Sequence, residues 1–257
     1  MKRIFLYPSL VLIGGLLLWD GAVQFSKSDI FPRPHEVLLG IVELVQRGVL
    51  LKYVVASLFR VSIGYTLAVV VGVTLGLLLG WSRAAFLAFN PLIQILRPIS
   101  PIAWIPIAIL WFHVDDRAPI FLIFLSSFFP ITVASIAAVQ NIQPVYVRAA
   151  QNFGLTRWDL FMRVIFPACL PQILTSLRIA LGIAWLVVVA AEMIAVNSGL
   201  GYLIIDARNA GKRYDLVVAG MLMIGLIGFV LDVLIRRLER FDQVKWGYFK
   251  SDHATNE

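Results

Sequence analysis

Charged side chains are rare in this chain, and Arg97 and Glu192 are two of those that interrupt long apolar stretches. Of its 257 residues, 60% are hydrophobic and 14% are charged. Arg97 and Glu192 each stand inside an apolar stretch. Because an ionised group at membrane depth is costly without water or a partner, each marks a transport path or an internal contact. Arg97 either attracts an anion or pairs with Glu192 or Asp232. Glu192 either lines a path or anchors the turn at 197–201.

The sequence carries no set of residues for catalysis. It has no GxxxxGK[ST] loop to cradle ATP phosphates, no HExxH and no Cys/His metal spacing. His113 with Asp115 and Asp116 supplies too few ligands for a metal site, so we expect a solvated turn there. Cys169 is the single cysteine, which excludes an intramolecular disulfide. We therefore expect a chain that is not an enzyme and that has no metal or cofactor of its own.

The elements that position these residues are predicted to be membrane-spanning helices. Spanning a bilayer takes about 20 apolar residues. Stretches of this kind lie at about 5–25, 58–80, 86–112, 118–139, 172–196 and 216–238. The sequence thus predicts an all-α polytopic membrane protein with six spans in a single domain, 1–257. The net charge of +7 suits positive-inside topology and lipid headgroups, and we expect no nucleic-acid partner.

Three further sequence patterns indicate how the predicted helices are placed. The apolar residues of 35–50 share one helical face, which predicts a helix lying on the outer interface. Small residues recur every four positions at 64–80, which lets helices approach closely, either within the subunit or at a dimer or pore seam. Prolines interrupt 86–112, so that segment should be buried against protein or line a cavity.

A polar hairpin is predicted at 144–171, between two apolar stretches. Pro144 can open a first short helix and Gly154 can end it. Thr156 with Asp159 reads as the N-cap pair of a second helix. Each helix is expected to have roughly ten residues, too few to span a bilayer. The hairpin should therefore lie at the membrane surface.

The hairpin resembles the EAA loop of ABC importer permeases. The matching residues have its spacing, although Arg148 stands where Glu is usual and Phe166 where Leu is usual; they are Arg148, Ala149, Ala150, Gly154, Val164, Phe166 and Pro167. The segments at 96–98, 103–106, 177–182, 191–193 and 198–202 extend the resemblance to the nitrate, sulfonate, taurine and bicarbonate branch, over about 32–246.

This resemblance implies the partners and the site residues. Two cytoplasmic ATPase subunits would hold ATP and Mg²⁺, and the hairpin would dock on them through Arg148, Ala149, Ala150, Gly154, Thr156 and Arg157. A second permease copy, as a homodimer, and an outer binding protein would complete the importer. Arg97, Trp104 and Glu192 are the candidates for the pathway of a small anion. The resemblance places the hairpin, and with it both termini, on the cytoplasmic side of a bacterial inner membrane.

The rival hypothesis is an ion-gradient-driven carrier or channel that needs no ATPase. Such a carrier usually shows inverted repeats or a relay of intramembrane ionisable groups. The sequence has no convincing repeat, and its three intramembrane acids, Asp20, Glu192 and Asp232, are scattered. The pattern therefore favours the ABC permease.

Overall fold

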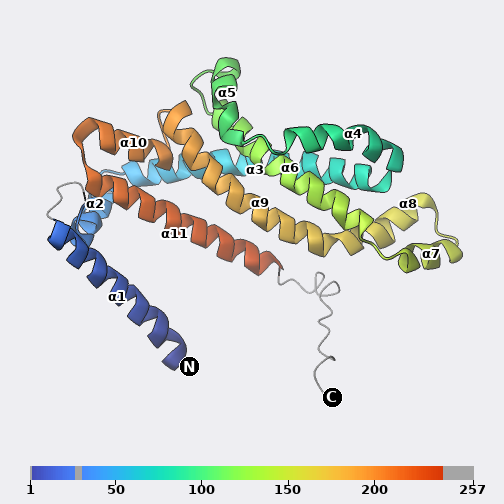
Figure 1. The fold of residues 1–257 in the computed structure, drawn as a ribbon, viewed down its shortest axis with the longest axis horizontal. Coiled ribbons are helices and arrows are strands. Elements are labelled where there is room, and N and C mark those ends of the chain that lie inside the picture. The colour runs from blue at the N-terminus through green and yellow to red at the C-terminus, as the bar shows by residue number, and fades with distance from the viewer. Residues whose placement is uncertain (1, 27–30, 240–257) are drawn as a thin grey trace.

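The fold is a bundle of long helices, described in a computed structural model for residues 2–26 and 31–239 (Figure 1). No strand occurs in these two ranges. The elements, in chain order, are α1 (Lys2–Ser26), α2 (Pro34–Gln46), α3 (Val49–Trp81), α4 (Arg83–Leu96), the 3-10 segment η1 (Pro101–Trp104), α5 (Ile105–Phe112), α6 (Arg117–Gln140), α7 (Pro144–Asn152), α8 (Arg157–Leu160), the π-helical segment η2 (Phe161–Ile165), α9 (Phe166–Ala195), α10 (Leu200–Gly211) and α11 (Tyr214–Glu239).

Within the described residues, four helical stretches are long and apolar enough to cross a bilayer. They are Val49–Trp81, Arg117–Gln140, Arg157–Ala195 and Tyr214–Arg237. The bent pair of α4 with η1–α5 makes a fifth if it counts as one span, and α1 holds a shorter apolar stretch, Ser9–Phe25. The protein is therefore an all-α multi-pass membrane protein, and the count of six spans stays a prediction.

The segment expected to span at 86–112 is not one straight helix. Arg83–Leu96 and Pro101–Phe112 meet at 84°. Prolines account for the break, because each lacks the N–H that would continue the helical hydrogen bonds. Pro98 and Pro101 stand at the break itself, and Pro106 lies in the first turn of α5.

Small residues let α3 and α6 pack almost backbone to backbone. A Cβ at Gly64 would lie 2.9 Å from the Ile123 side chain, and one at Gly80 would lie 2.7 Å from Val139. Gly72 and Gly76 face the intervening turns of α6 with the same residue offset, so the two helices run parallel. The seam at 64–80 therefore serves packing within the subunit, as small-residue faces do in membranes.

Because α3 and α6 run parallel, the segment between them must return along the bundle. Leu96, at the end of α4, packs with Phe128 and Phe129 near the middle of α6. Trp104 packs on the hydrophobic cluster that includes Val187, in the half of α9 away from the hairpin. The bend between α4 and α5 therefore lies about halfway along the bundle.

The second helix of the hairpin differs from its prediction as a short surface helix. α8 continues through η2 into α9, so that 157–195 forms one apolar helical stretch. In η2 the Phe166 N–H donates to the Phe161 carbonyl, five residues back. Pro167 follows directly and has no N–H for the Arg163 carbonyl, which an uninterrupted α-helix would need. The hairpin is therefore connected rigidly to a spanning helix.

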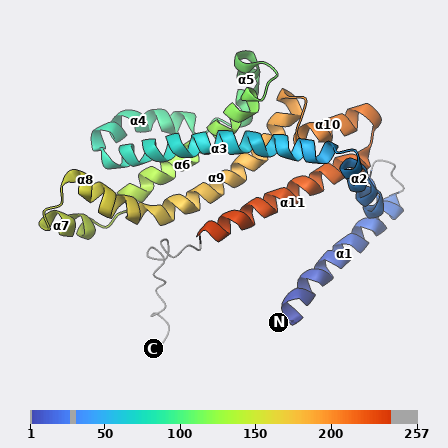
Figure 2. The same cartoon turned by 180° about the vertical axis from the view of Figure 1, so that it is seen from behind.

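The two ends of the bundle differ in their elements. α9 runs antiparallel to both α3 and α11, as shown by the contacts of Ser57 with Glu192 and of Arg178 with Asp232. The α7–α8 hairpin lies at one end, and α2 and α10 lie at the other (Figures 1 and 2). α1 meets the rest near α2, and Trp19 packs on the cluster that includes Val37.

Candidate transport and coupling sites

A buried ion cluster joins four segments at the end of the bundle opposite the hairpin. Arg60 of α3 is 1% exposed and donates to Glu192 Oε1 at 2.5 Å and to Asp116 Oδ1 at 2.7 Å. It also donates to the Ser198 carbonyl at 2.8 Å and to the Ser198 hydroxyl. Ser57, one helical turn away, donates to Glu192 Oε2 at 2.8 Å. These bonds satisfy the buried guanidinium and the buried Glu192 carboxylate.

The turn before α10 is built around the Glu192 carboxylate. The Gly201 N–H donates to Glu192 Oε2 at 3.0 Å, and the Leu200 N–H donates to the Ser57 hydroxyl. Gly199 has φ +106, and a Cβ there would collide with the carboxylate, so only glycine fits. Of the two hypotheses for Glu192, its contacts support the anchor for the 197–201 turn.

Sequence reasoning missed Arg60 and misread Asp116. The predicted span began at 58, whereas α3 begins at Val49, so Arg60 lies three helical turns inside the helix. The available signal was a lone arginine on one helical face with Ser57 in an otherwise apolar stretch. Asp116 was expected in a solvated turn, but its carboxylate pairs with Arg60 while its side chain stays 50% exposed.

Arg97 lies at the bend, halfway along the bundle, and its side chain is exposed. Neither of the ion pairs considered for it forms, because Glu192 pairs with Arg60 and Asp232 with Arg178 and Arg236. Within 2–26 and 31–239 its guanidinium has no hydrogen bond or ion pair. Its backbone N–H alone is bonded, to the Ile93 carbonyl at 2.9 Å.

Trp104 is half-buried beside the bend. Its ring meets Phe121 of α6 edge to face, with centroids 6.4 Å apart, and it packs against α9. One side remains accessible, next to the exposed residues Ile102 and Ala103. Trp104 therefore fixes the bend against the bundle and remains partly exposed.

The hairpin turn is set by Gly154 and Thr156. Gly154 has φ +73, its N–H donates to the Gln151 carbonyl at 2.9 Å, and the Leu155 N–H donates to the Ala150 carbonyl at 3.2 Å. These two bonds form a Schellman motif, which ends α7. Thr156 Oγ1 accepts from the Asp159 N–H at 3.2 Å and so caps the next helix.

Five of the six predicted docking residues are exposed, and the sixth, Ala150, is buried. Arg148, Ala149, Gly154, Thr156 and Arg157 are exposed. Ala150 is instead 6% exposed and packs with residues such as Leu160, Cys169 and Ala138, which fixes the base of the hairpin on α6 and α9.

Large aromatic side chains at the hairpin tip were missed by sequence reasoning. Phe153 is 85% exposed and Trp158 is 68% exposed, and Tyr146 projects from α7 nearby. The signal in the sequence that could have identified them was their position beside the polar residues of the turn. An exposed apolar patch of this kind, rimmed by polar groups, is typical of a surface that contacts another protein or a membrane.

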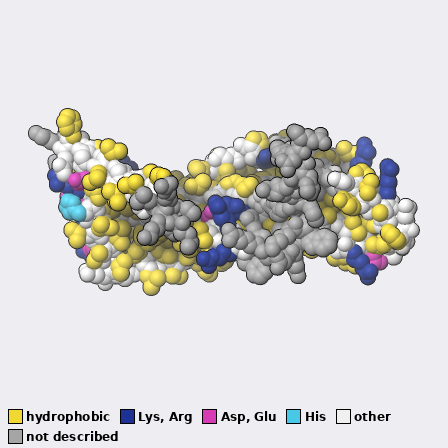
Figure 3. Space-filling view, turned by 90° about the horizontal axis from the view of Figure 1, so that it is seen from below, with side chains coloured by type: hydrophobic (Ala, Val, Ile, Leu, Met, Phe, Trp, Pro, Cys, Tyr) yellow, Lys and Arg dark blue, Asp and Glu magenta, His cyan; other side chains and the backbone are white. Residues whose placement is uncertain are grey.

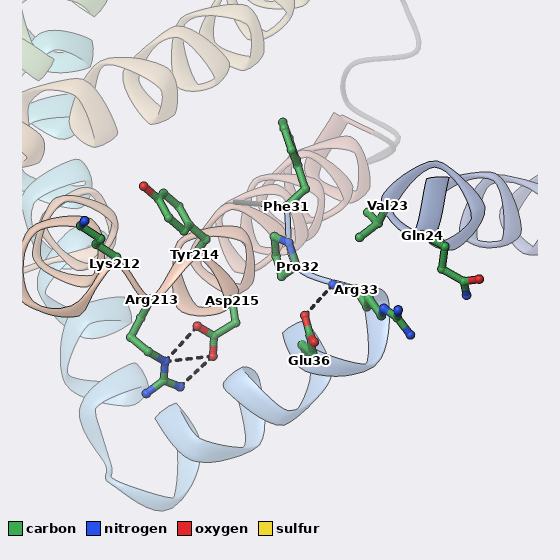
Figure 4. A pocket seen from close by; sticks show the side chains of 10 residues that line it. All are labelled: Val23, Gln24, Phe31, Pro32, Arg33, Glu36, Lys212, Arg213, Tyr214 and Asp215. Carbon is green, nitrogen blue, oxygen red and sulfur yellow. Dashed lines mark hydrogen bonds and ion pairs between the residues drawn. The ribbon is translucent and has the colours of Figure 1, made fainter. Parts of the chain in front are cut away.

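A polar cavity of 680 Å³ lies at the opposite end, between the α10–α11 turn and the start of α2 (Figure 4). Lys212 and Tyr214 project from one side of it, and Phe31 and Arg33 lie on the other. Arg213 is turned to Asp215 at 2.7 Å and to Glu43 of α2 at 2.6 Å. Its hydrogen bond holds the pKa of Glu43 below the usual value. Arg213 therefore clamps α2 to α11.

The sequence of this chain matches a known protein family and several of its members. Residues 68–241 match the family described as binding-protein-dependent transport system inner membrane component. The taurine transport system permease protein TauC of Escherichia coli is 35% identical over 86% of this chain and 82% of that protein. The nitrate import permease protein NrtB of Leptolyngbya laminosa is 40% identical over 71% of this chain and 65% of that protein.

Solved structures share the fold at low sequence identity. A bacterial alginate ABC transporter, in complex with an alginate pentasaccharide-bound periplasmic protein, matches with a TM-score of 0.64 and 18% identity over 93% of this chain and 95% of that one. The MetNI methionine ABC transporter, in inward-facing conformations, matches with a TM-score of 0.60 and 18% identity over 75% and 97%. With the family match, these findings show that this chain belongs to the inner membrane components of binding-protein-dependent transport systems, as a permease subunit of an ABC transporter.

Proposed function

We propose that this permease imports a small anion that a separate outer binding protein delivers. Relatives named for nitrate, taurine and aliphatic sulfonate transport support this substrate class, and bicarbonate belongs to the same expectation. ATP is hydrolysed on two separate cytoplasmic ATPase subunits, and this chain is not itself catalytic. The family match favours this importer over a gradient-driven carrier.

The observation that carries the anion proposal is the isolated charge of Arg97. Arg60 and Arg178 both bond to carboxylates, whereas the Arg97 side chain is exposed at mid-depth without a partner among the described residues. A guanidinium at that depth is tolerable only where it meets water or another subunit. In a pair of permease copies, an open seam at the bend satisfies this requirement and attracts anions.

The pathway then lies between two copies of this chain, along the exposed side of the bend. Arg97 supplies the charge and Trp104 a half-buried aromatic wall. Glu192 is fully buried in its ion cluster, so we assign it to holding the outer ends of α3, α9 and α10 together.

The hairpin docks on an ATPase subunit and transmits its closure to the spanning helices. Exposed Phe153 and Trp158 add an apolar anchor to the exposed residues of the turn. Because α8 continues into α9, a displacement of the hairpin moves a whole span. This placement puts the hairpin and both termini in the cytoplasm and the ion cluster at the outer end.

The test measures uptake of radiolabelled taurine, nitrate, bicarbonate and an alkanesulfonate by cells that carry the complete transporter. Once the transported anion is found, we expect Arg97→Ala to reduce its uptake strongly and Arg97→Lys to keep part of it. Arg117→Ala, which removes an exposed arginine from the outer loop, serves as the matched control. Unchanged uptake kinetics in Arg97→Ala would overturn the pathway assignment.

A further inference from the structure

A groove between α9 and α11 lies near the middle of the bundle. It has a volume of 370 Å³, and its walls are mostly aliphatic. Ile179 and Leu186 of α9 line it and are 60% and 72% exposed. Gly182 stands between them, and a Cβ added there would meet nothing within 4 Å. The glycine therefore leaves open a space that a larger side chain would fill.

One end of the groove is closed by direct packing of the two helices. The Trp185 indole packs directly on Gly228, because a Cβ added to that glycine would lie only 2.9 Å from the ring. The indole Nε1–H donates to the Ile224 carbonyl at 3.1 Å. From Trp185 the groove runs along α9 to Arg178, a distance of about 10 Å at 1.5 Å per residue.

The other end of the groove is cationic. Asp232 accepts from Arg178 at 2.9 Å and from Arg236 at 2.8 Å, and Arg237 follows with an exposed side chain. Arg178 and Arg236 thus share one carboxylate, and with Arg237 next in sequence these four side chains carry an excess of positive charge. Figure 3 shows Lys and Arg side chains gathered at the middle of the lower face, next to apolar surface.

We propose that this groove binds one anionic phospholipid of the leaflet on the hairpin side. Its phosphate lies against Arg236 and Arg237, and one acyl chain lies over Gly182. The aliphatic walls with a cationic end match an amphiphile with an anionic head, and clusters of arginine beside a span attract anionic lipids. A water-borne anion gains nothing from the apolar walls, and a packed helix from a second copy would need an acidic group at the arginine end.

The test uses the purified transporter complex and compares Gly182→Leu with wild type. Leucine fits the open space and favours the helix over glycine, so the variant should fold. Gly225→Leu is the matched control, because it adds the same side chain at an exposed α11 glycine with nothing within 4 Å and outside the groove. Thermal stability is measured with added phosphatidylglycerol, phosphatidylcholine or inorganic phosphate.

A ligand that binds only the folded state raises its melting temperature. We expect phosphatidylglycerol, but neither phosphatidylcholine nor phosphate, to raise the Tm of wild type and Gly225→Leu. Gly182→Leu should lose this rise, and Arg236→Gln with Arg237→Gln should lose the preference for the anionic lipid. An equal rise in Gly182→Leu would overturn the proposal. So would dissociation of the permease pair in Gly182→Leu on native mass spectrometry, since it would show that a second copy fills the groove.

Discussion

Two arginines of this chain, Arg60 in the ion cluster and Arg97 at the bend, have opposite environments. Arg60 is enclosed by Glu192, Asp116 and Ser198 and cannot reach a solute. Arg97 is exposed at a helix break. A buried charge with a full set of hydrogen bonds is a structural element, whereas an exposed one at membrane depth needs water or a partner. The anion assignment therefore rests on Arg97.

The ion cluster predicts a characteristic pattern of stability. Glu192→Gln leaves Arg60 buried with only the half-exposed Asp116 as a carboxylate partner. Removing one partner of a buried pair typically costs about 3–5 kcal/mol, so we expect a large fall in the Tm of the purified complex.

Replacing both partners, as in Arg60→Met with Glu192→Met, removes the uncompensated charge and should restore part of that loss. A double-mutant cycle built from these two substitutions isolates the coupling free energy between the Arg60 and Glu192 side chains. If the double variant is no more stable than Glu192→Gln, the pair is not the source of the effect.

Sequence reasoning found Arg97 and missed Arg60 for a physical reason. An arginine among prolines in an apolar stretch is conspicuous by itself. The partners of Arg60 are distant in sequence, with Asp116 in a loop and Glu192 on α9, so only the packing of α3 against α9 and this loop brings them together. For the same reason the sequence left open which group paired with Glu192.

At the scale of elements, the turn at Gly154 predicts the behaviour of the hairpin. Gly154→Pro cannot adopt φ +73 and removes the N–H that bonds to Gln151. We expect the variant to insert in the membrane but to lose co-purification of the ATPase. Gly154→Asn is the control, since asparagine tolerates the left-handed conformation and should keep the ATPase bound. Normal co-purification with the proline variant would contradict the docking assignment.

The clamp between α2 and α11 predicts a response to acid. The hydrogen bond from Arg213 lowers the pKa of Glu43 from its ordinary value of 4.5. Because the pKa of the Glu43 carboxyl is lowered, its contact with Arg213 stabilises the fold fully above pH 4.5. This stabilisation is lost as the pH falls through the lower pKa of the folded state.

Hydrogen-exchange protection of α2 should therefore decrease modestly as the pH falls below 4.5. The effect is small because the pair is partly exposed to solvent. Arg213→Gln should show lower protection at neutral pH and little further loss in acid. A wild-type profile that does not change with pH would argue against the clamp.

Helices could be predicted from the sequence more readily than their connections. Pro144, Gly154 and Thr156 mark the hairpin because caps and turns are local. The angle at Pro98–Pro101 and the continuity of α8 with α9 depend on tertiary packing, which the sequence does not display. The small-residue seam of α3 indicated close packing, but its partner, α6, could be identified only in the fold.

At the scale of the whole molecule, the two ends of the bundle should face different compartments. Cys169 is the only cysteine in the sequence and is buried, so an introduced cysteine can be labelled selectively. In intact cells, we expect a membrane-impermeant maleimide to label Lys212→Cys and not Gln151→Cys. Permeabilised cells provide the control, in which both should react. Labelling of Gln151→Cys alone in intact cells would reverse the proposed orientation.

The proposed import depends on coupling between an outer binding protein, this permease and separate ATPase subunits. The most direct measurement is ATP hydrolysis by the purified complex in lipid, with its binding protein, in the presence of nitrate, bicarbonate, taurine or alkanesulfonates. We predict that one of these anions stimulates hydrolysis and that Arg97→Ala weakens the stimulation. If only an uncharged or cationic solute stimulates hydrolysis, the anion assignment of Arg97 is wrong. If no ATPase co-purifies with the permease, the proposed coupling through the hairpin is contradicted.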